Sequence, residues 1–417
     1  MKELFIKMIL IKNNKISINL LLLAVASIPV SVGLMNSFFL LSLIFVFLSN
    51  DVRVYFLKSL GNTMVRSSLI LWFLFCVGLF WSITDINDAL IYLKKYSVLL
   101  FPFLFSPLMT EKSNRKKLID WFMGSMTLIL FITYILLLSS QDSFYIQLNE
   151  KIDIAFNVQN GFKSHIITNI LMAFFLYLSF LRAIVRTSKI KFFYLFLGIL
   201  TTHYVFFISA GSTGQIIAII LIFFLLYKLL NKAIFFISLL AFSIFSFMGY
   251  SNIELKNKYY FKKIPETLES ILTKDRLHLG RRPQLYENAI KIWLDRPLFG
   301  TGTGGYNFAF REKLPEIYYK TPGAKRNPHN EYLHFLIQFG VIGFFLLIRL
   351  FYKNYTSIKT LKSLEEKNYA LGLLIVFLVA AAGNSIIMDS GEGHFWAIMS
   401  MAFFAGKRTE ELNISKK

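Results

Sequence analysis

Apolar runs of membrane-spanning length divide this chain from one end to the other. A helix needs about 20 mostly apolar residues to cross the hydrocarbon core of a bilayer, and runs near that length predict about twelve spans here. Their expected limits are 16–32, 34–49, 67–84, 89–109, 118–138, 165–181, 192–209, 214–230, 233–250, 331–350, 369–388 and 393–406. The predicted fold class is therefore an all-α polytopic membrane protein.

Composition excludes the soluble alternatives. Hydrophobic residues make up 55% of the chain, and 45 Phe stand against 24 acidic residues in total. A soluble domain could not bury so much apolar surface, which excludes an ordinary cytosolic enzyme and a disordered chain. The single cysteine, Cys76, excludes an intrachain disulfide and a cysteine-pair metal or redox site. The basic start from Lys2 to Lys15 also resembles a signal peptide, but the many later runs favour an uncleaved first span.

Lysine and arginine sort the loops into two sides. The only basic residues in the short loops on one side are Lys151 and Lys163. The basic residues gather instead before the first run, after the last run, and in segments 50–66, 110–117, 182–191, 228–232 and 349–367. Cytoplasmic loops of membrane proteins carry the excess of positive charge. We therefore expect an even number of spans, with the N- and C-termini in the cytoplasm.

The long segment 251–330 falls on the outer side although it is basic, and long loops cross the membrane largely regardless of charge. The expected parts are transmembrane helices in 1–250, one large loop on the outer side in 251–330, and transmembrane helices with a short cytoplasmic tail in 331–417. Pro283 can open a loop helix whose apolar face carries Leu285, Ala289 and Ile292, so the loop is expected to be partly helical. The positive charge of this loop indicates either a solvated surface or a positively charged entrance to a site for an anionic substrate.

A histidine lies where the outer loop enters the tenth expected span. In the sequence NPHNEYLH, Asn327 is a suitable N-cap and Pro328 a suitable first helical residue, which places His329 in the first turn. The positive end of a helix disfavours imidazolium and attracts phosphate, so a neutral His329 beside an anion suits general-base chemistry. The alternative is a histidine with a structural role at the membrane interface. His334 does not match the i, i+4 spacing of zinc-binding histidines, so we expect no metal site.

Other residues that carry chemistry lie on the same outer side. Arg281 and Arg282 open the loop helix, and guanidinium groups at a helix start suit a diphosphate. Lys94 and Lys95 lie within the fourth expected span, where lysine is costly unless it snorkels or meets an anion. His165 opens the sixth expected span. The alternatives are solvated arginines, snorkelling lysines and a structural histidine.

Two further features have weaker meaning. The run Gly300–Gly305 fits G-x-G-x-x-G, but it follows a helix in the outer loop rather than a strand. We therefore expect a tight turn there, with backbone amides beside a phosphate as the second interpretation. The last outer loop gathers Asp389, Glu392 and His394, and loop polarity alone also explains that group.

Together these residues resemble the O-antigen ligase family and its polymerase relatives. The most specific element is His329-Asn330, followed by nine residues and the run GVIG at 340–343. Upstream, RPQLYE from Arg282 and RPLFGTGTGGY from Arg296 are similar to the family's arginine-to-aromatic helix and Pro-x-x-Gly-x-Gly turn. The family also has many membrane spans with one large outer loop before the histidine, which is the arrangement expected here.

The resemblance implies a multi-pass enzyme of the Gram-negative inner membrane, with its active site facing the periplasm. Its donor is a glycan on undecaprenyl diphosphate, and its acceptor is a hydroxyl of the lipid A core, as in lipopolysaccharide biosynthesis. The resemblance implies a transfer that inverts the configuration of the anomeric carbon and uses no metal or other cofactor. It also implies contact with membrane lipids and no binding of nucleic acid. His329 would take the acceptor proton, and Arg282 would hold the diphosphate. The remaining candidates are Arg281, Lys94 and Lys95 for the diphosphate, and Asn330, Glu331, His165 and Glu392 for the acceptor or for support.

One position departs from the family pattern. The family often has Ser-Arg or Thr-Arg at the outer end of the helix after the seventh span, whereas Ser212 stands where that arginine would lie. A second diphosphate-binding arginine is therefore missing there, and Lys94, Lys95 or Arg281 are candidates to replace it. The gap leaves an O-antigen polymerase or another lipid-linked glycosyl transfer as alternatives. A secondary transporter is the alternative from another class, although transporters usually bind near the bilayer midplane.

Overall fold

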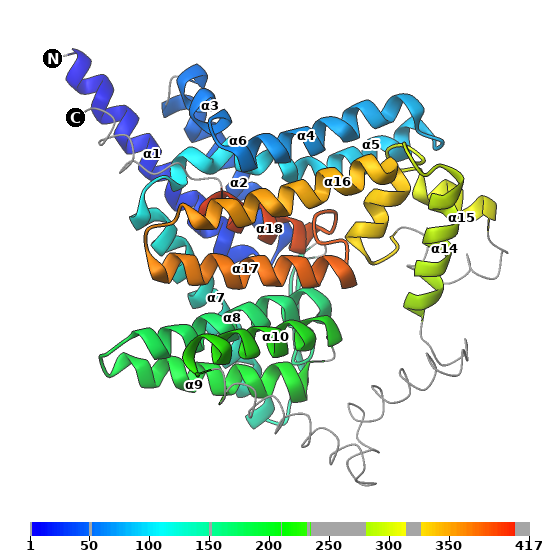
Figure 1. Ribbon diagram of the computed structural model, residues 1–417. Coiled ribbons are helices and arrows are strands. Elements are labelled where there is room, and N and C mark those ends of the chain that lie inside the picture. The colour runs from blue at the N-terminus through cyan, green and yellow to red at the C-terminus, as the bar shows by residue number, and fades with distance from the viewer. Residues whose placement is uncertain are drawn as a thin grey trace, which may run out of the picture.

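The computed structural model describes residues 2–49, 52–149, 152–209, 211–231, 234, 281–313 and 327–404. Within them, long helices lie side by side and form a bundle, with α14 and α15 at one end (Figure 1). The helices are α1 (Lys2–Ser27), α2 (Val32–Ser49), α3 (Val52–Leu60), α4 (Thr63–Val77), α5 (Ile86–Lys95), α6 (Phe101–Phe105), α7 (Lys112–Leu138), α8 (His165–Val185), α9 (Ile190–His203), α10 (Ser212–Leu229), α14 (Arg281–Asp295), α15 (Tyr306–Lys313), α16 (Glu331–Lys359), α17 (Leu364–Gly383) and α18 (Ser390–Phe403). Shorter turns continue some of them, namely η1 (Gly78–Trp81), η2 (Tyr96–Leu100), η3 (Ser106–Met109) and η4 (Tyr204–Ile208).

The helical membrane class is confirmed. Eight helical segments of the described chain are long and apolar enough to cross a bilayer, and two shorter apolar helices lie at Asn14–Ser27 and Val32–Leu48. Each expected span within the described residues falls on one of the helices. The expected span at 233–250 and the loop up to residue 280 lie outside the described residues. The count of twelve spans and the extent of the outer loop therefore stay predictions.

Local capping explains where several helices begin. The side chain of Asn62 accepts hydrogen bonds from Met64 N at 2.7 Å and Val65 N at 3.4 Å at the start of α4. Ser363 caps α17 and accepts from Glu366 N at 3.5 Å, which is the S-x-x-E pattern of a capping box. These polar residues interrupt the apolar sequence and supply acceptors for N–H groups that have no partner within the helix.

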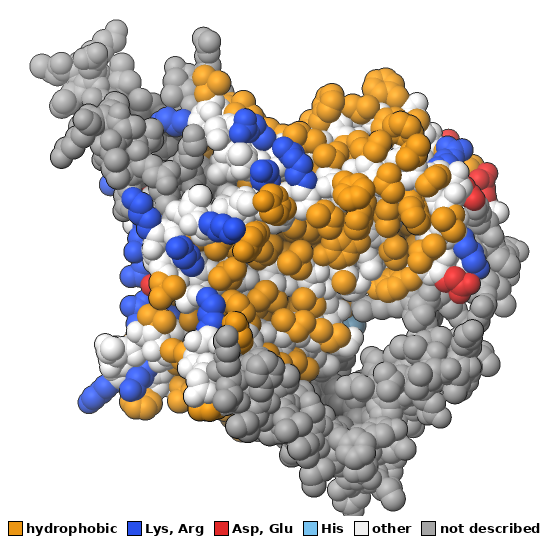
Figure 2. Space-filling model, in the orientation of Figure 1, with side chains coloured by type: hydrophobic (Ala, Val, Ile, Leu, Met, Phe, Trp, Pro, Cys, Tyr) orange, Lys and Arg blue, Asp and Glu red, His pale blue; other side chains and the backbone are white. Residues whose placement is uncertain are grey.

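The helix α8 lies at the centre of the bundle. In its most apolar window, 83% of the residues are buried inside the protein, and it packs against α9, α10 and α17. Helices near the periphery instead expose large apolar side chains, among them Phe73, Ile135 and Phe345. Figure 2 shows such side chains covering the long flank of the bundle, as expected for a surface that contacts lipid rather than water.

A β-hairpin is the exception to the all-α prediction. Strands β1 (Ser143–Asn149) and β2 (Ile152–Asn157) pair antiparallel between α7 and α8, with Phe144 opposite Phe156. Apolar residues alternate along both strands, which is the period of a β-strand rather than a helix. Strands this short do not form apolar runs of membrane-spanning length, so the sequence pattern of spans does not predict the hairpin.

The loop helix α14 forms as the sequence predicts. It ends at Asp295, and its expected apolar residues Leu285, Ala289 and Ile292 are all buried. They pack in a small hydrophobic cluster with residues of α15 and α16, including Tyr306. This cluster attaches α14 and α15 to the first turns of α16, which directly follow the candidate histidine.

The helix α16 is kinked at Gly340. This residue has φ 60° and ψ −157°, a combination that is open almost only to glycine. The next residue, Val341, donates its N–H to the carbonyl of Pro297 at 2.9 Å instead of to the preceding helical turn. A Cβ atom at position 340 would lie 2.2 Å from the Leu298 carbonyl oxygen, so the turn after α14 and the kink require each other.

Candidate active site

His329 precedes α16 rather than lying in its first turn. The N-cap is Asn330, whose side-chain oxygen accepts from Leu333 N at 3.0 Å. His329 has φ 51°, in the left-handed region that few residues other than Gly, Asn, Asp and His adopt. The expected N-cap, Asn327, instead accepts from the backbone N–H of His329 at 2.7 Å. The first-turn prediction is therefore wrong, because both asparagines suit a cap and the later one fills that role.

The segment before α16 is fixed to the end of α17 and to the α17–α18 loop. The side-chain amide of Asn330 donates to the Ala382 carbonyl at 3.0 Å, and the Ser385 hydroxyl donates to the side chain of Asn327. From α14, the Tyr286 hydroxyl donates to the same Ala382 carbonyl at 3.0 Å. Three elements thus hold the backbone around the candidate histidine, and a general base depends on such positioning.

Two carboxylates and two lysines lie close to this segment at the same end of the bundle. Asp389 precedes α18, and Glu392 is buried in the first turn of that helix. Burial raises the pKa of the Asp389 carboxyl, and the positive charge of Lys95 opposes that rise. Lys163, which lies just before α8, likewise favours the ionised form of the Glu392 carboxyl through its positive charge. The four side chains form a cluster of mixed charge, which suits a polar substrate better than a lipid contact.

The structure separates the two lysines of α5. Lys95 is half-buried, lies 5.7 Å from the centroid of the Tyr92 ring, and is close enough to Asp389 to act on its pKa. Lys94 is exposed. Consecutive residues project roughly 100° apart around a helix, so only one of the pair can turn inward. Lys95 therefore remains a site candidate, whereas Lys94 does not join the cluster.

The other predicted residues lie at the starts of helices. Arg281 and Arg282 begin α14, although their side chains lie outside the described part of the chain. His165 begins α8 and is half-buried, and Ser212 begins α10. Glu331 is fully buried at the start of α16. Helix starts thus bring several predicted positions to one end of the bundle without placing all of them in contact.

The Gly-rich turn Gly300–Gly305 holds α16 and does not offer its first amides to a ligand. The N–H of Thr301 donates to the Ile337 carbonyl at 2.8 Å, and the N–H of Gly302 donates to the Gln338 carbonyl at 2.9 Å. These are carbonyls that the kink in α16 leaves without a helical partner. The expectation of a tight turn is confirmed, and the phosphate interpretation is wrong for these amides because they are already bonded.

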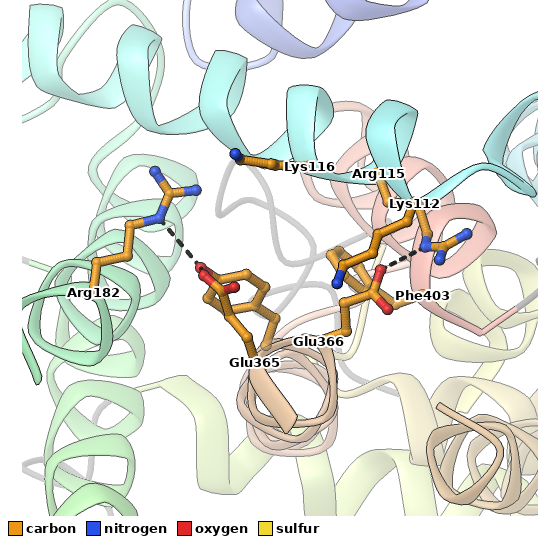
Figure 3. Close-up of a pocket in the computed structure, with 8 residues that line it drawn as sticks. Lys112, Arg115, Lys116, Arg182, Glu365, Glu366 and Phe403 are labelled. Carbon is orange, nitrogen blue, oxygen red and sulfur yellow. Dashed lines mark hydrogen bonds and ion pairs between the residues drawn. The ribbon is translucent and has the colours of Figure 1, made fainter. Parts of the chain in front are cut away.

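A pocket at the opposite end of the bundle is a less suitable site. It is lined by Lys112, Arg115, Lys116, Arg182, Glu365, Glu366, Tyr369 and Phe403 (Figure 3). Arg115 pairs with Glu366 at 2.8 Å, and Arg182 pairs with Asp120 at 2.6 Å, so both guanidinium groups are already engaged. The α16 helix runs between the two ends, a length of roughly 40 Å at the rise of an α-helix. These ion pairs brace the basic end of the bundle.

Two residues near this end of the bundle are not among the sequence predictions: Lys163, which belongs to the cluster of mixed charge, and Tyr96, which bonds to Glu331. Tyr96 directly follows Lys95 at the point where α5 gives way to η2. Lys163 is one of only two lysines in the short outer loops, which is a signal that could have selected it. Among the residues that the structure describes, no group of three or more His, Cys, Asp or Glu side chains is arranged to hold a metal ion.

Lys163 provides a test of the cluster's electrostatics. Burial lowers its pKa from 10.5 to about 8, although Glu392 favours its charged form. The folded pKa lies below the unfolded value, so the unfolded chain binds more protons between those two pH values and stability rises with pH there. We expect Lys163→Met to raise the thermal midpoint in detergent at pH 7, with a smaller gain near pH 10. The exposed Lys189 is the control, and an equal gain from Lys189→Met would contradict this.

Comparison with known proteins connects this geometry to a family. Residues 167–348 match the family model described as O-Antigen ligase. The match runs from α8 into α16 and includes both His329 and the kink at Gly340. No curated protein matches the chain. Through residues 167–348, the chain is similar to the O-antigen ligase family.

Proposed function

We propose that this protein is an O-antigen ligase that moves a glycan from undecaprenyl diphosphate to a hydroxyl of the lipid A core. The family covers O-antigen ligases and related polymerases, which are glycosyltransferase-like membrane enzymes. The observation that carries the proposal is the junction before α16, where His329 lies in a fixed segment beside a cluster of charged side chains. That arrangement suits a proton transfer next to an anionic leaving group.

In the proposed reaction, His329 takes the proton from the acceptor hydroxyl as its oxygen attacks the anomeric carbon of the donor glycan. The bond from that carbon to the diphosphate oxygen breaks, the configuration inverts, and undecaprenyl diphosphate leaves with the electron pair. Diphosphate is a good leaving group, so one base, cations and positioning are sufficient. Arg282, with Arg281, is proposed to hold the diphosphate, and Asn330 supports His329 by fixing the helix start. We propose no metal or other cofactor for this chemistry.

Charge distribution supports a periplasmic site. Lys and Arg side chains gather at the end of the bundle where α7 begins and where α8 and α16 end, as Figure 2 shows. Positive charge marks the cytoplasmic side of membrane proteins. His329 lies at the opposite end, so we propose that it faces the periplasm of a Gram-negative inner membrane and that both termini are cytoplasmic.

A polymerase is the second candidate, favoured by Ser212. This residue begins α10 at the position where the family often has an arginine for the diphosphate. Lys95 is the described cation that we propose as its replacement, because it lies in the outer cluster. A polymerase would use the same donor but join it to another lipid-linked repeat instead of to the core.

The proposed donor site predicts a graded effect of removing cations. A hydrogen bond to a charged group contributes about 1.5–3 kcal/mol, which corresponds to roughly a 10- to 150-fold change in rate. We therefore expect Arg282→Ala and Lys95→Ala each to slow transfer within that range. Arg282→Lys keeps the charge but loses the planar fork, so it should remain clearly impaired. Rates of purified variants with a lipid-linked donor measure the effect.

Lys94 is the matched control for Lys95. The two residues are adjacent and carry the same charge, but Lys94 is exposed and lies away from the cluster. Lys94→Ala should leave the rate nearly unchanged. Equal losses for both lysine variants would mean that general charge at this end matters rather than a specific contact. Near-normal rates for Arg282→Ala and Lys95→Ala would place the diphosphate elsewhere.

The function is tested by deleting the gene in its host and separating the lipopolysaccharide on a gel. Loss of all capped core, with a complete core left, is the result expected for a ligase. A core that carries a single repeat would indicate a polymerase instead. Complementation with the intact gene should restore the full ladder, whereas the His329→Ala gene should not.

A further inference from the structure

A buried hydrogen-bond chain connects α16 with η2. The Tyr96 hydroxyl donates to Glu331 Oε1 at 2.7 Å and lies 3.0 Å from His334 Nδ1. The second carboxylate oxygen, Glu331 Oε2, accepts the backbone N–H of Ile387 at 3.0 Å. Tyr96, Glu331 and His334 have no exposed surface. Three elements therefore meet at Glu331: η2, α16 and the α17–α18 loop that also fixes the segment around His329.

The single proton of Tyr96 sets the direction of this chain. A tyrosine hydroxyl carries one proton, and here the carboxylate of Glu331 accepts it. When Glu331 is ionised, His334 Nδ1 carries a proton and donates it to the Tyr96 oxygen, and Nε2 of the neutral imidazole is a hydrogen-bond acceptor. When Glu331 is protonated, the direction of the chain reverses and Nε2 carries the imidazole proton.

Three polar atoms next to the chain are buried and have no hydrogen-bond partner among the residues that the structure describes. They are His334 Nε2, Tyr306 Oη and Gln338 Nε2. The ring centroids of Tyr306 and His334 lie 6.0 Å apart. Gln338 follows His334 by about one helical turn, and its Oε1 accepts the N–H of Gly304 at 2.7 Å, close to Tyr306 in the chain. The three side chains therefore lie together between α15 and α16.

The chemistry of this group matches one kind of ligand. His334 Nε2 accepts or donates according to the tautomer, the Gln338 amide donates, and the Tyr306 hydroxyl can donate or accept, so a water molecule can pair with all three. Buried water typically makes about three hydrogen bonds to polar groups that have no other partner. An apolar ligand would leave all three groups unpaired, and their complete burial excludes a large polar one.

We propose that His334 links the Tyr96–Glu331 pair to an enclosed water molecule held by Tyr306 and Gln338, and that this chain positions the start of α16 for transfer. The proposal gives these side chains a positioning role, since they are buried and do not touch the substrate. It rests on the proposed function only for its effect on transfer; the hydrogen-bond chain and its water stand apart from the reaction. The hydrogen-bond chain would act by holding the α17–α18 loop and the His329 segment in a fixed position relative to each other.

The water is tested by the sign of a stability change. Tyr306→Phe keeps the ring and removes only the hydroxyl. Removing a buried hydroxyl that has no partner should raise the thermal midpoint, whereas removing one that binds a water should lower it. We expect Tyr306→Phe to lower the midpoint of the purified protein in detergent. An unchanged or raised midpoint would overturn the water site.

Tyr134 supplies the matched control for that measurement. Its hydroxyl donates to the Leu200 carbonyl at 2.9 Å and lies 2.7 Å from His203 Nδ1, so it is a bonded hydroxyl beside a histidine in another pair of helices. Tyr134→Phe should lower the midpoint and so calibrate the loss of a bonded hydroxyl. It should leave the rate of transfer unchanged, because it lies outside the proposed chain.

The positioning role is tested by separating kcat from KM. We expect Tyr96→Phe to lower kcat about tenfold, equivalent to 1.36 kcal/mol, with KM for the lipid-linked donor unchanged. An unchanged kcat would overturn the positioning role. If Tyr96→Phe does not give folded protein, Tyr306→Phe carries the kinetic test, with a lower kcat at constant KM as the expected result. If the protein proves not to transfer glycan at all, the stability measurement still decides the water site, so the two failures remain distinct.

Discussion

Replacing His329 by alanine is expected to lower transfer by a factor of about 10²–10⁴, which is the usual contribution of a positioned general base. The backbone of His329 is held by hydrogen bonds that do not involve its ring, including the N–H bond to Asn327 at 2.7 Å. The variant should therefore still insert and fold, with a thermal midpoint lowered modestly because alanine is less favourable than histidine at φ 51°. The measurement is transfer by purified protein at saturating donor and acceptor.

His203 is the matched control for this variant. It is an exposed histidine at the end of α9, bonded to Tyr134 and separate from the outer cluster. His203→Ala should keep transfer near the parental rate. Transfer by the His329→Ala protein at the parental rate would remove the general-base role, whatever the effect of the control.

Gly340→Ala is expected to destabilise the protein severely. The backbone at this position is in a region that is nearly exclusive to glycine, which costs about 1–3 kcal/mol for other residues. The added Cβ would also lie 2.2 Å from the backbone oxygen of Leu298, which cannot move without breaking the turn. We expect a lower thermal midpoint and a lower yield of folded protein from membranes.

The control is a glycine in a regular helix. Gly124 lies within α7, and a Cβ there would meet nothing within 4 Å. Gly124→Ala should therefore be neutral or stabilising by about 0.5–1 kcal/mol, because alanine has the higher helix propensity. If Gly340→Ala behaves like Gly124→Ala, the kink is not required and the turn does not depend on it.

The sequence predicts the helices well because the bilayer imposes their length and composition. Each backbone polar group in a membrane needs a partner within the segment, so a long apolar run leaves few structures other than a helix. The hairpin at 143–157 lies outside this constraint, and its short alternating strands carry a weaker signal. Helix starts are also less certain, since Asn327 and Asn330 both suit a cap and only the three-dimensional contacts decide between them.

The candidate site is predicted in part for a similar reason. The motif from His329 to the glycines at 340–343 is local in the sequence, and the structure explains its second half through the kink and the turn at 297–302. The partners of Glu331 and His334 are not local. Tyr96 is 235 residues away from Glu331 in the chain, and no spacing rule connects them. Likewise, only the helix phase and the neighbouring carboxylate distinguish Lys95 from Lys94.

The most direct test of the account is transfer by the purified protein with an undecaprenyl-diphosphate-linked glycan and a lipid A-core acceptor, in the presence of EDTA. The account predicts that the glycan appears on the core with inverted configuration, that undecaprenyl diphosphate is released, and that the His329→Ala protein does neither. Donor glycans joined to each other while the core stays bare, or transfer that stops on removal of divalent ions, would contradict it.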